Sequence, residues 1–439
     1  MLKNPIGPTV GDDLCSRFDL LTAGWQGGAM AALERCVIVG ASLAGLRIAE
    51  TLRQSDEVGD VVVIGAEPHR PYDRPPLSKK VLSGEWDPER AVLRPAETLD
   101  ALDVTWRLGE PATGLSLDAE LPAAQLAGGE VVAANAVFIA TGAHPRRIAD
   151  ADAHPNVHVL RTLDDALALR ADLDTSARRV AVVGAGFIGL EVAATARRAG
   201  HDVVVIEAAE APLMRALGAE MGAAIAGLHR VEGVEVRCGV GVDEFVEQGL
   251  VVDGDLVEAD VIVVGIGATP TTDWLVGSGV ALDDGVVCDA SLRVLDPNGA
   301  TVPGVYAAGD VVRWDLPEFG GAVRVEHWTN AVEQGAHAAQ TALAVAAGDE
   351  PTPYAPLPFF WSDQFDHRIQ FLGHPGPNDQ VEVVAGSVPD GKWLAVYSDG
   401  DRLTGTLGVN APKWVMPTRR WFAEGMTRDA ALAAARELA

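Results

Sequence analysis

The chain has 439 residues, more than one compact domain usually holds, so we expect two to four domains. Its formal net charge of −28 argues against partners such as nucleic acid and anionic membranes, because both would repel it. No apolar run approaches the roughly 20 residues of a membrane-spanning helix, and the four scattered cysteines fit the reduced thiols of a cytoplasmic protein.

The first ordered unit follows residues 1–33, which are glycine-rich and unpatterned and are expected to form a disordered extension. An apolar strand, VIVGASLAG at residues 37–45, runs into a glycine turn and a helical pattern, and a second strand, VVVIGAE, ends at Glu67. Ser42 replaces the middle glycine, so this site can be looser than usual. Glu67 is the expected ribose contact, and the turn residues expected to bind a nucleotide are Gly40, Ser42, Leu43, Ala44 and Gly45.

The same pattern recurs, with a complete motif, in VAVVGAGFIG at residues 180–189. The three glycines allow a tight turn, close approach of the pyrophosphate and helix packing, and the helix N-terminus attracts phosphate. Glu207 ends the next strand, where it can bind both ribose hydroxyls, and no arginine follows to accept a 2′-phosphate. The duplication therefore predicts two nucleotide sites, the second selective for NADH over NADPH, although a glycine turn without a ligand is the alternative. Its expected contacts are Gly184, Gly186, Phe187, Ile188, Gly189 and Glu207.

Two further strands follow. VIVVGIGATP ends at Pro270, and GVYAAGD ends at Asp310. A small-residue strand that ends in Gly-Asp is typical of flavoproteins, in which the aspartate accepts hydrogen bonds from the ribityl chain of FAD. We therefore expect Gly309 and Asp310 to contact FAD, and the alternative for Asp310 is a helix N-cap.

The last third of the chain begins with an alanine-rich helical pattern from Gly335 to about Ala347 and a proline-rich linker at residues 351–358. Antiparallel strands and a C-terminal helix, Thr427 to Leu438 with Thr427 as its N-cap, are expected beyond it. The predicted fold is α/β, with two Rossmann-like dinucleotide-binding domains and a small α+β C-terminal domain. The expected boundaries are 34–145 with 258–345 for FAD, 146–257 for NADH, and 346–439 for the C-terminal domain.

Eight segments occur in the order seen in the ferredoxin reductases of oxygenase systems, the family of putidaredoxin reductase and the biphenyl dioxygenase reductases. They are GASLAG, RPYDRPPLSK, ATGAHPR, GAGFIGLE, GIGATP, GVYAAGD, EHW and FFWSDQ. The chain resembles this family from about Arg35 to its C-terminus. It is similar, more distantly, to rubredoxin reductase and apoptosis-inducing factor.

The resemblance implies catalytic roles for Lys79, at the flavin N5 edge, for Glu191, its partner near the nicotinamide, and for Trp361, where the flavin edge meets the surface. The alternatives are a solvated lysine, a first-turn helix acid and ordinary aromatic packing. Gly267 is a further NAD contact by the same likeness. The further FAD contacts that it implies are Arg74, Lys79, Ala112, Thr141, Gly142, Arg146, His327 and Trp328.

The predicted activity is hydride transfer from NADH to FAD, followed by single-electron transfer to a ferredoxin that serves a monooxygenase or a Rieske oxygenase. No paired cysteines, Ser/His/Asp arrangement or clustered metal ligands occur in the sequence, so we expect neither a disulfide relay nor a metal. A reductase of rubredoxin or a quinone, and a redox-regulated interaction protein like apoptosis-inducing factor, remain alternatives. The chain is expected to be a monomer or homodimer, and an acidic ferredoxin would need a local basic patch, to which the arginines of residues 416–421 could contribute.

Overall fold

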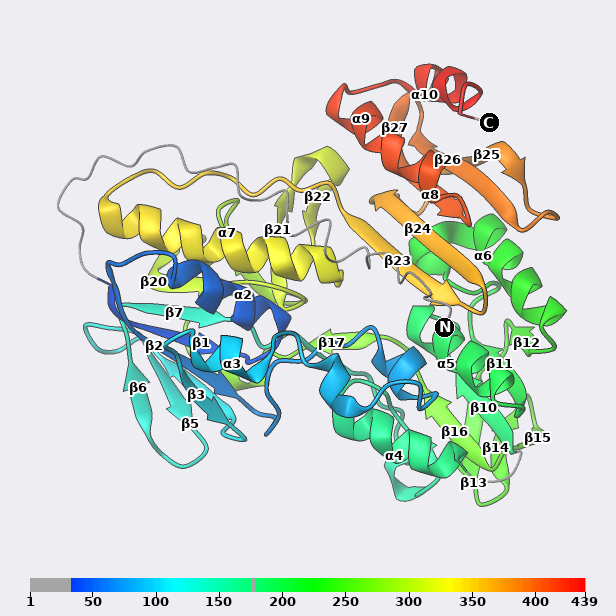
Figure 1. Cartoon of the computed structure of the whole chain (residues 1–439), viewed down its shortest axis with the longest axis horizontal. Coiled ribbons are helices and arrows are strands. Elements are labelled where there is room, and N and C mark those ends of the chain that lie inside the picture. Colours follow the sequence, from blue (N-terminus) through cyan, green and yellow to red (C-terminus); the bar gives the residue numbers. More distant parts are fainter. Residues whose placement is uncertain (1–32, 175–177, 439) are drawn as a thin grey trace, which may run out of the picture.

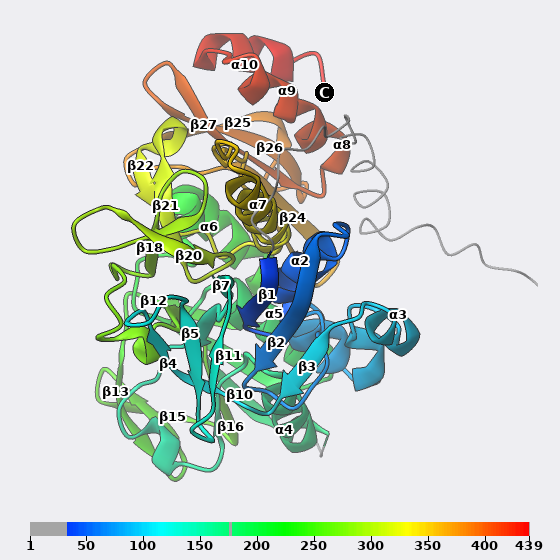
Figure 2. The ribbon, with the colours of Figure 1, turned by 90° about the vertical axis from the view of Figure 1, so that its left-hand side faces the viewer.

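The computed structural model describes residues 33–174 and 178–438 (Figure 1). The predicted N-terminal extension lies outside the described residues except for Leu33, which already begins strand β1. Figures 1 and 2 show the C-terminal helices at one end of the molecule and the hairpins β13 to β15 at the other. The predicted α/β fold is confirmed, with two parallel sheet regions and a separate antiparallel sheet between residues 359 and 409.

The first sheet has nine strands in the order β22-β21-β18-β19-β20-β7-β1-β2-β3. Its centre is parallel, and Cys36, Val37 and Ile38 of β1 are fully buried, as expected for a strand covered on both faces. The strands are β1 Leu33–Val39, β2 Val58–Gly65, β3 Thr105–Leu108, β7 Ala136–Ile139, β18 Val286–Cys288, β19 Arg293–Leu295, β20 Thr301–Ala307, β21 Val312–Leu316 and β22 Gly321–Val323.

Two helices, α2 (Leu43–Leu52) and α7 (Trp328–Ala347), pack closely beside this sheet. A Cβ on Gly335 would lie 2.7 Å from the carbonyl oxygen of Ala44, so only glycine permits this approach. Smaller elements complete the region between β2 and β7. They are α3 Ala96–Asp100, η1 Leu77–Val81, η2 Pro88–Ala91 and the antiparallel sheet of β4 Ala112–Ser116, β5 Ala123–Leu126 and β6 Val131–Ala133.

The second sheet is wholly parallel, in the order β12-β11-β10-β16-β9. Its strands are β9 Val157–His158, β10 Arg179–Val183, β11 Asp202–Glu207, β12 Glu235–Cys238 and β16 Val261–Val264, and its helices are α4 Leu163–Leu173, α5 Phe187–Arg198 and α6 Met214–Val231. Hairpins β13 Val242–Val246, β14 Gly249–Val252 and β15 Asp255–Glu258 precede β16, and β8 Ala143–Pro145 pairs with β17 Ala268–Pro270. Short 3₁₀ turns are η3 Ala151–Ala153, η4 Asp273–Leu275 and η5 Pro317–Phe319.

The third sheet is antiparallel, as predicted, in the order β23-β24-β27-β26-β25. Thr427 is the N-cap of the last helix, also as predicted, because its hydroxyl accepts a hydrogen bond from the Ala430 N–H at 3.4 Å. That helix ends at Ala435 rather than Leu438. The elements are β23 Phe359–Gln364, β24 His367–Gly373, β25 Gln380–Ser387, β26 Lys392–Asp399, β27 Arg402–Val409, α8 Pro412–Val415, η6 Met416–Thr418, α9 Arg419–Ala423 and α10 Arg428–Ala435.

Three expectations about individual elements are wrong. The run at residues 261–270 is two strands, because Gly267 adopts a φ of +107° and breaks it. The first of them, β16, pairs with β10, so it lies in the second sheet and not with the first, where the boundary at residue 257 had placed it. Helix α7 begins at Trp328, well before Gly335, because its first turns pack into the interior. The domain division as a whole stays a prediction.

Candidate functional site

The first glycine turn joins β1 to α2 at the carboxyl end of the strand. Gly40 has a φ of +124°, and a Cβ there would lie 2.1 Å from the carbonyl oxygen of Ala140. A Cβ on Gly45 would lie 1.8 Å from the carbonyl oxygen of Gly40, so the chain's own packing requires both glycines. Ser42 has an ordinary φ of −112° and makes no side-chain bond to the helix, which leaves the first N–H groups of α2 for a phosphate.

The second glycine turn joins β10 to α5 in the same way. A Cβ on Gly184 would lie 2.4 Å from the carbonyl oxygen of Gly265, and one on Gly189 would lie 2.2 Å from that of Gly184. Gly186 differs, because the nearest atom to its Cβ would be 3.8 Å away. Glu207, at the end of β11, accepts hydrogen bonds from the N–H groups of Ala185 at 2.6 Å and Ala209 at 2.8 Å. The carboxylate therefore lies directly beside this turn.

The end of β20 meets the start of α2. A Cβ on Gly309 would lie 3.2 Å from the Cβ of Ala44, and the Gly309 N–H donates to Gln334 Oε1 at 2.8 Å. Asp310 forms an ion pair with Arg161 at 3.0 Å. The alternative of Asp310 as a helix N-cap is wrong, because strand β21 follows it and no helix begins there.

Three polar side-chain atoms, one on Arg161 and two on residues in or directly before α7, are shielded from solvent, and the described residues offer them no hydrogen-bond partner. They are Gln334 Nε2, Arg161 Nε and His327 Nδ1. Burial, with a smaller effect of His374, lowers the pKa of His327 to about 3 and keeps the ring neutral. Because unsatisfied buried donors are costly, the Gln334 and Arg161 groups fit a bound polar ligand such as the phosphate or ribityl chain of the predicted FAD.

The loop after β2 is held by a second polar cluster. Arg74 donates to Glu67 Oε1 at 2.7 Å and to the carbonyl oxygen of Arg161 at 2.6 Å, and the Tyr72 hydroxyl donates to Glu67 Oε2. Glu67 and Arg74, both predicted to contact FAD, thus already bind each other. This cluster fixes the approach to η1, and the roles of both residues toward FAD stay predictions.

Lys79 and Glu191 form the ion pair expected from the sequence, with Lys79 Nζ 2.8 Å from Glu191 Oε2. Lys79 lies in η1, which follows the first glycine unit, and Glu191 lies in α5, which opens from the second. Ser78 Oγ donates to the same oxygen at 2.5 Å, and Ser362 Oγ donates to Glu191 Oε1 at 2.7 Å. The pair therefore joins the two units that contain the glycine turns, through a buried carboxylate that has three donors.

Trp328 and Trp361 lie in contact beside η1. Their ring centroids are 5.9 Å apart, and the Trp328 indole N–H donates to Asp73 at 2.8 Å. Burial raises the pKa of Asp73, although this hydrogen bond and the Lys79 charge oppose the rise. Trp361 also stacks on Phe359 at 6.1 Å, so it contributes to the packing of the third sheet whatever its role toward a cofactor.

The remaining predicted contacts follow β7 or begin β4. The Thr141 hydroxyl donates to the Thr271 carbonyl at 2.8 Å, and Gly142 has a φ of +66°. Arg146 is exposed, and its backbone N–H donates to the Gly267 carbonyl oxygen at 2.9 Å. A residue predicted to contact FAD and one predicted to contact NAD are therefore neighbours. Ala112 begins β4 and packs on the core of the first sheet. The structure gives these residues positions, and their ligand contacts stay predictions.

Sequence reasoning missed four residues that the structure brings to the site. Ser78 and Ser362 lie inside quoted motifs, so the sequence marked their neighbourhood but not their bond to Glu191. Arg161 and Gln334 carry no local signal, because each meets its partner only through the fold. The exposed side chain of Arg420 pairs with Glu424, which places one predicted docking arginine on the surface.

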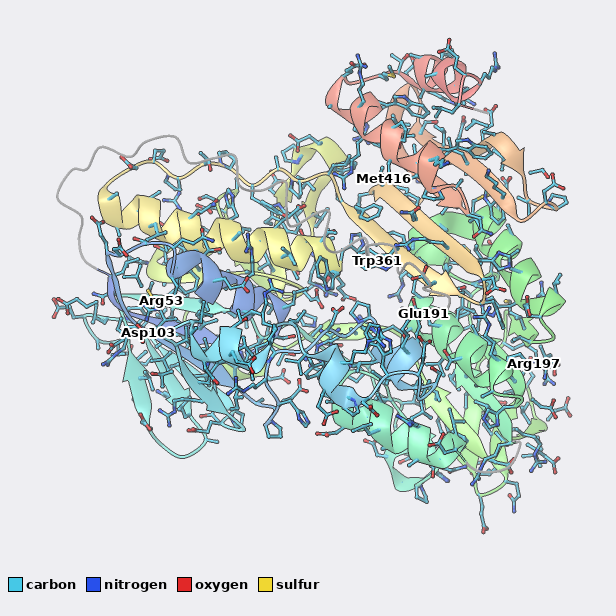
Figure 3. All side chains as sticks on the ribbon, viewed as in Figure 1. Arg53, Asp103, Glu191, Arg197, Trp361 and Met416 are labelled. Carbon is cyan, nitrogen blue, oxygen red and sulfur yellow. The ribbon has the colours of Figure 1, made fainter. Side chains whose placement is uncertain are left out.

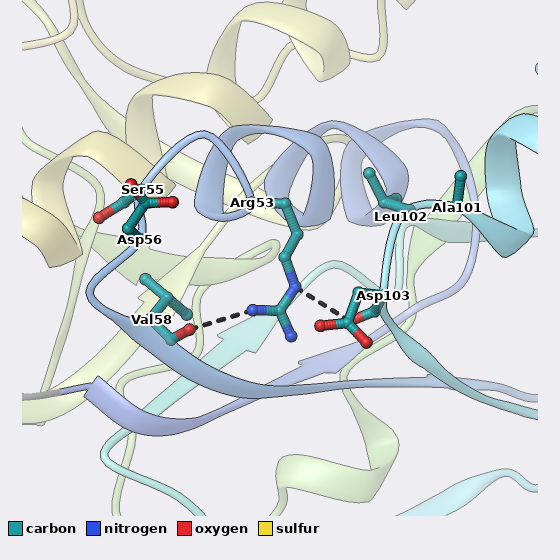
Figure 4. Close-up of a pocket in the computed structure, with 7 residues that line it drawn as sticks. All are labelled: Arg53, Ser55, Asp56, Val58, Ala101, Leu102 and Asp103. Atoms are coloured by element: carbon teal, nitrogen blue, oxygen red, sulfur yellow. Dashed lines mark hydrogen bonds between the residues drawn. The ribbon is translucent and has the colours of Figure 1, made fainter.

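A surface cavity of about 420 Å³ lies elsewhere, beside Arg53 (Figure 4). The Arg53 guanidinium donates to the carbonyl oxygens of Asp103 at 3.0 Å, Val58 at 3.1 Å and Gly59 at 2.8 Å, so it has little left for a ligand. The cavity lies at the amino end of β2, whereas ligands of parallel sheets bind at the carboxyl ends. Figure 3 likewise shows Arg53 and Asp103 well away from Glu191 and Trp361.

Residues 33–174 and 178–438 contain neither a metal-binding cluster nor a membrane-spanning helix. No group of three or more His, Cys, Asp or Glu side chains there could hold a metal ion. None of the helices in the same ranges is long and apolar enough to cross a membrane.

Known families account for nearly all of the described residues. Residues 34–335 match the family described as pyridine nucleotide-disulphide oxidoreductase, and residues 359–439 match the family described as reductase C-terminal. The three described cysteines are free, so the disulfide in the first family's name has no counterpart among them.

Several known proteins are similar over nine-tenths or more of their length. Rhodocoxin reductase of Rhodococcus erythropolis is 36% identical over 397 residues, which cover 89% of this chain and 90% of that protein. The ferredoxin–NAD(+) reductase component of the anthranilate 1,2-dioxygenase system of Burkholderia cepacia is 38% identical, covering 90% of this chain and 95% of its own length. A crystal structure of Fdr9 has 41% identity and a TM-score of 0.80 over 91% of this chain and 97% of its own. The covalent putidaredoxin reductase–putidaredoxin complex has 30% identity and a TM-score of 0.81, covering 90% and 94%.

Proposed function

The chain belongs to the pyridine nucleotide-disulphide oxidoreductase family, and from this membership we propose that it is an NADH-dependent FAD flavoprotein that reduces a ferredoxin of an oxygenase system. The observation that carries the proposal is the pair of glycine turns at the carboxyl ends of two parallel sheets, joined by Lys79 and Glu191. One turn serves each nucleotide. The ion pair lies where elements of the two units meet.

FAD, when bound, supplies a hydride acceptor that can release electrons one at a time. The residues proposed to hold it are the first turn, from Gly40 to Gly45, and the end of β20, Gly309 and Asp310. Gln334 and Arg161 support this assignment, because each has a shielded N–H to offer and each already touches one of those two residues. Trp328, whose indole N–H is hydrogen-bonded to Asp73, lies at the start of α7 and would position the flavin ring.

NADH, rather than NADPH, is the proposed electron donor. The Glu207 carboxylate lies against the second turn and carries the charge that would repel a 2′-phosphate. The next two residues, Ala208 and Ala209, offer no cation in exchange. Glu191 and Lys79 would orient the nicotinamide and flavin edges and help to exclude water between them.

A ferredoxin is the proposed acceptor because the named relatives include ferredoxin reductases that are similar over about nine-tenths of both chains. Within the described residues Cys36, Cys238 and Cys288 are free, and no two are close in sequence. Electrons therefore have no disulfide route among these residues and would leave near Trp361, at the edge of the third sheet. Free thiols and the use of NADH also support a cytoplasmic location.

The test is to mix the purified yellow protein with NADH and with candidate acceptors under anaerobic conditions. The expected result is fast reoxidation of the flavin by a matched ferredoxin and slow reoxidation by rubredoxin or a quinone. Faster turnover with rubredoxin or a quinone would replace the ferredoxin in the proposal. Tight NADH binding without turnover on any acceptor would favour a redox-regulated interaction protein. Reduction that weakens as salt is added would indicate charged docking.

A further inference from the structure

The Lys79–Glu191 pair continues into a buried chain of polar side chains. Ser362, which donates to Glu191, accepts a hydrogen bond from Gln364 Nε2 at 3.1 Å, and Gln364 Oε1 lies 2.9 Å from His229 Nε2. Glu191 is 6% exposed, Gln364 is 2% exposed, and Ser362 and His229 are fully buried. These four hydrogen-bonded side chains join α5 and α6 of the second unit to β23 of the third sheet.

The alternation of β23 explains why these residues meet. Phe360, Ser362 and Gln364 are two apart and share one face of the strand. Phe360 packs edge-on against Phe187 at 4.8 Å, and Ser362 bonds Glu191, which lies four residues further along α5 on the same helix face. One face of β23 therefore packs along one face of α5. Figure 3 shows Glu191 near the strand that carries Trp361.

Each hydrogen bond among these side chains has its donor on the side away from Glu191 and its acceptor on the side nearer to it. Gln364 Oε1 can only accept, so His229 Nε2 carries the ring proton. Burial lowers the pKa of His229, which favours the neutral ring with a single N–H. The Gln364 amide then donates to Ser362, and the serine hydrogen is left for the carboxylate. The other ring nitrogen of His229, Nδ1, has no hydrogen-bond partner among the described residues.

We propose that Ser362, Gln364 and His229 are positioning residues that hold the Glu191 carboxylate, and through it Lys79, in one orientation. The inference rests on the proposed function for its catalytic consequence. Ser78 and Lys79 both hold Glu191 Oε2, whereas Ser362 holds Oε1. Loss of the Ser362 hydroxyl leaves Oε1 unpaired and frees the carboxylate to turn, which shifts the Lys79 ammonium.

Two measurements on the full-length purified protein test this. Ser362→Ala should lower the rate of flavin reduction at saturating NADH by about tenfold with little change in KM, because misplaced groups cost rate more than binding. It should also raise the rate of Lys79 acetylation relative to Lys80 by about threefold, followed by peptide mass spectrometry. Lys80 is an internal reference, because it is exposed and pairs with Glu85. Lys79 and Lys80 are adjacent in the sequence, so fragment ions of their shared peptide assign each acetyl group to one of the two residues.

Matched variants separate positioning from general destabilisation. Gln364→Glu keeps the size of the side chain but accepts a hydrogen bond from Ser362, so it should show the same two changes. Ser362→Thr keeps the hydroxyl, so its rates of flavin reduction and of Lys79 acetylation should both be native. Thr406→Val removes a buried hydroxyl of β27, in the same sheet as Ser362, that hydrogen-bonds Thr418 of η6 at 2.8 Å. This variant should change neither the rate of flavin reduction nor the rate of Lys79 acetylation.

The outcomes separate the two proposals. If the native protein shows no flavin reduction, the proposed function fails, and Lys79 labelling still decides the positioning chain. If Ser362→Ala and Gln364→Glu leave both the reduction rate and the Lys79 labelling unchanged, the positioning chain is overturned and the proposed function stands. If Ser362→Ala does not fold, Gln364→Glu decides alone.

Discussion

The two glycine turns have the same backbone plan, and one of their three glycine positions differs. Gly186 occupies the middle of the second turn, and Ser42 occupies the middle of the first. Both adopt extended backbone, with φ of −74° at Gly186 and −112° at Ser42, so neither needs glycine for its conformation. A Cβ on Gly186 would meet no protein atom closer than 3.8 Å.

The outer glycines give the opposite result in both turns. A Cβ on Gly40, Gly45, Gly184 or Gly189 would lie between 1.8 Å and 2.4 Å from a backbone oxygen. The outer glycines are therefore required for folding, whereas the middle one matters only when a ligand approaches the backbone. The first turn can carry a serine if its ligand lies slightly further away.

The largest effect is expected for the outer glycines. Gly40→Ala and Gly184→Ala should each lower the free energy of unfolding by roughly 3 kcal/mol, because they add a clash with backbone to a strained φ. Denaturant unfolding of the purified variants measures this. Gly254→Ala is the control, since Gly254 has a φ of +82° but open space around it, and it should lose only about 1 kcal/mol. Equal losses in all three variants would contradict the packing argument.

The next effect concerns pH, because burial lowers the pKa of His327 and of His229. His327 directly precedes α7, and His229 lies in α6. Above pH 6.5 His327 is neutral in both states and contributes nothing. As the pH falls from 6.5 toward its folded pKa of about 3, only the unfolded chain takes up the proton, so stability is lost. The loss from this residue should reach about 2 kcal/mol at pH 5.

His327→Asn checks that loss. Asparagine keeps a good N-cap for α7 and does not titrate. The pH dependence of unfolding should become shallower between pH 6.5 and 5 in this variant, and an unchanged slope would show that His327 is not responsible.

A smaller effect, on binding alone, is expected at the middle position. Gly186→Ala should leave the free energy of unfolding within about 0.5 kcal/mol of the native value but weaken NADH binding by about tenfold, because the methyl group meets only the ligand. Ser42→Gly is its counterpart and should bind FAD at least as tightly as the native chain. Calorimetric titration and flavin content measure the two. A Gly186→Ala protein with native NADH affinity would contradict the assignment of that turn.

The smallest effect separates the two acids that follow the turns. Glu207→Gln should raise kcat/KM for NADPH relative to NADH by about fivefold, because it removes the charge that opposes a 2′-phosphate. Glu67→Gln should leave this ratio unchanged, since Glu67 is paired with Arg74 in the first unit. A ratio that moves equally in both variants would contradict the assignment of NADH to the second turn.

The parts of the molecule that depend on local pattern could be predicted from the sequence. The buried Val/Ile strands, the glycine turns and the N-cap at Thr427 are set by neighbouring residues. The start of α7 at Trp328 could not be predicted, because Trp, Thr and Asn favour helix only weakly and packing decides. The apolar run of β16 would suit either sheet, and its pairing with β10 is a tertiary fact.

The site divides in the same way. Lys79 and Glu191 were predicted as a pair by resemblance, and the ion pair is confirmed, while their catalytic roles stay predictions. The bond from Arg161 to Asp310 and the bond from Gln334 to Gly309 join residues far apart in the chain, so no local signal could reveal them. Side chains alternate along a strand, so Ser362 shares a face of β23 with Phe360, but only the fold shows that this face meets α5.

The most direct test of two nucleotide sites joined by a hydride step is a single-turnover experiment without oxygen. The native protein is mixed rapidly with NADH, or with NADH that carries deuterium at the transferred position, and the flavin absorbance is followed. The yellow absorbance should bleach in one turnover, and deuterium should slow the bleaching. A protein that binds NADH and keeps its yellow absorbance would show that no hydride passes from NADH to the flavin.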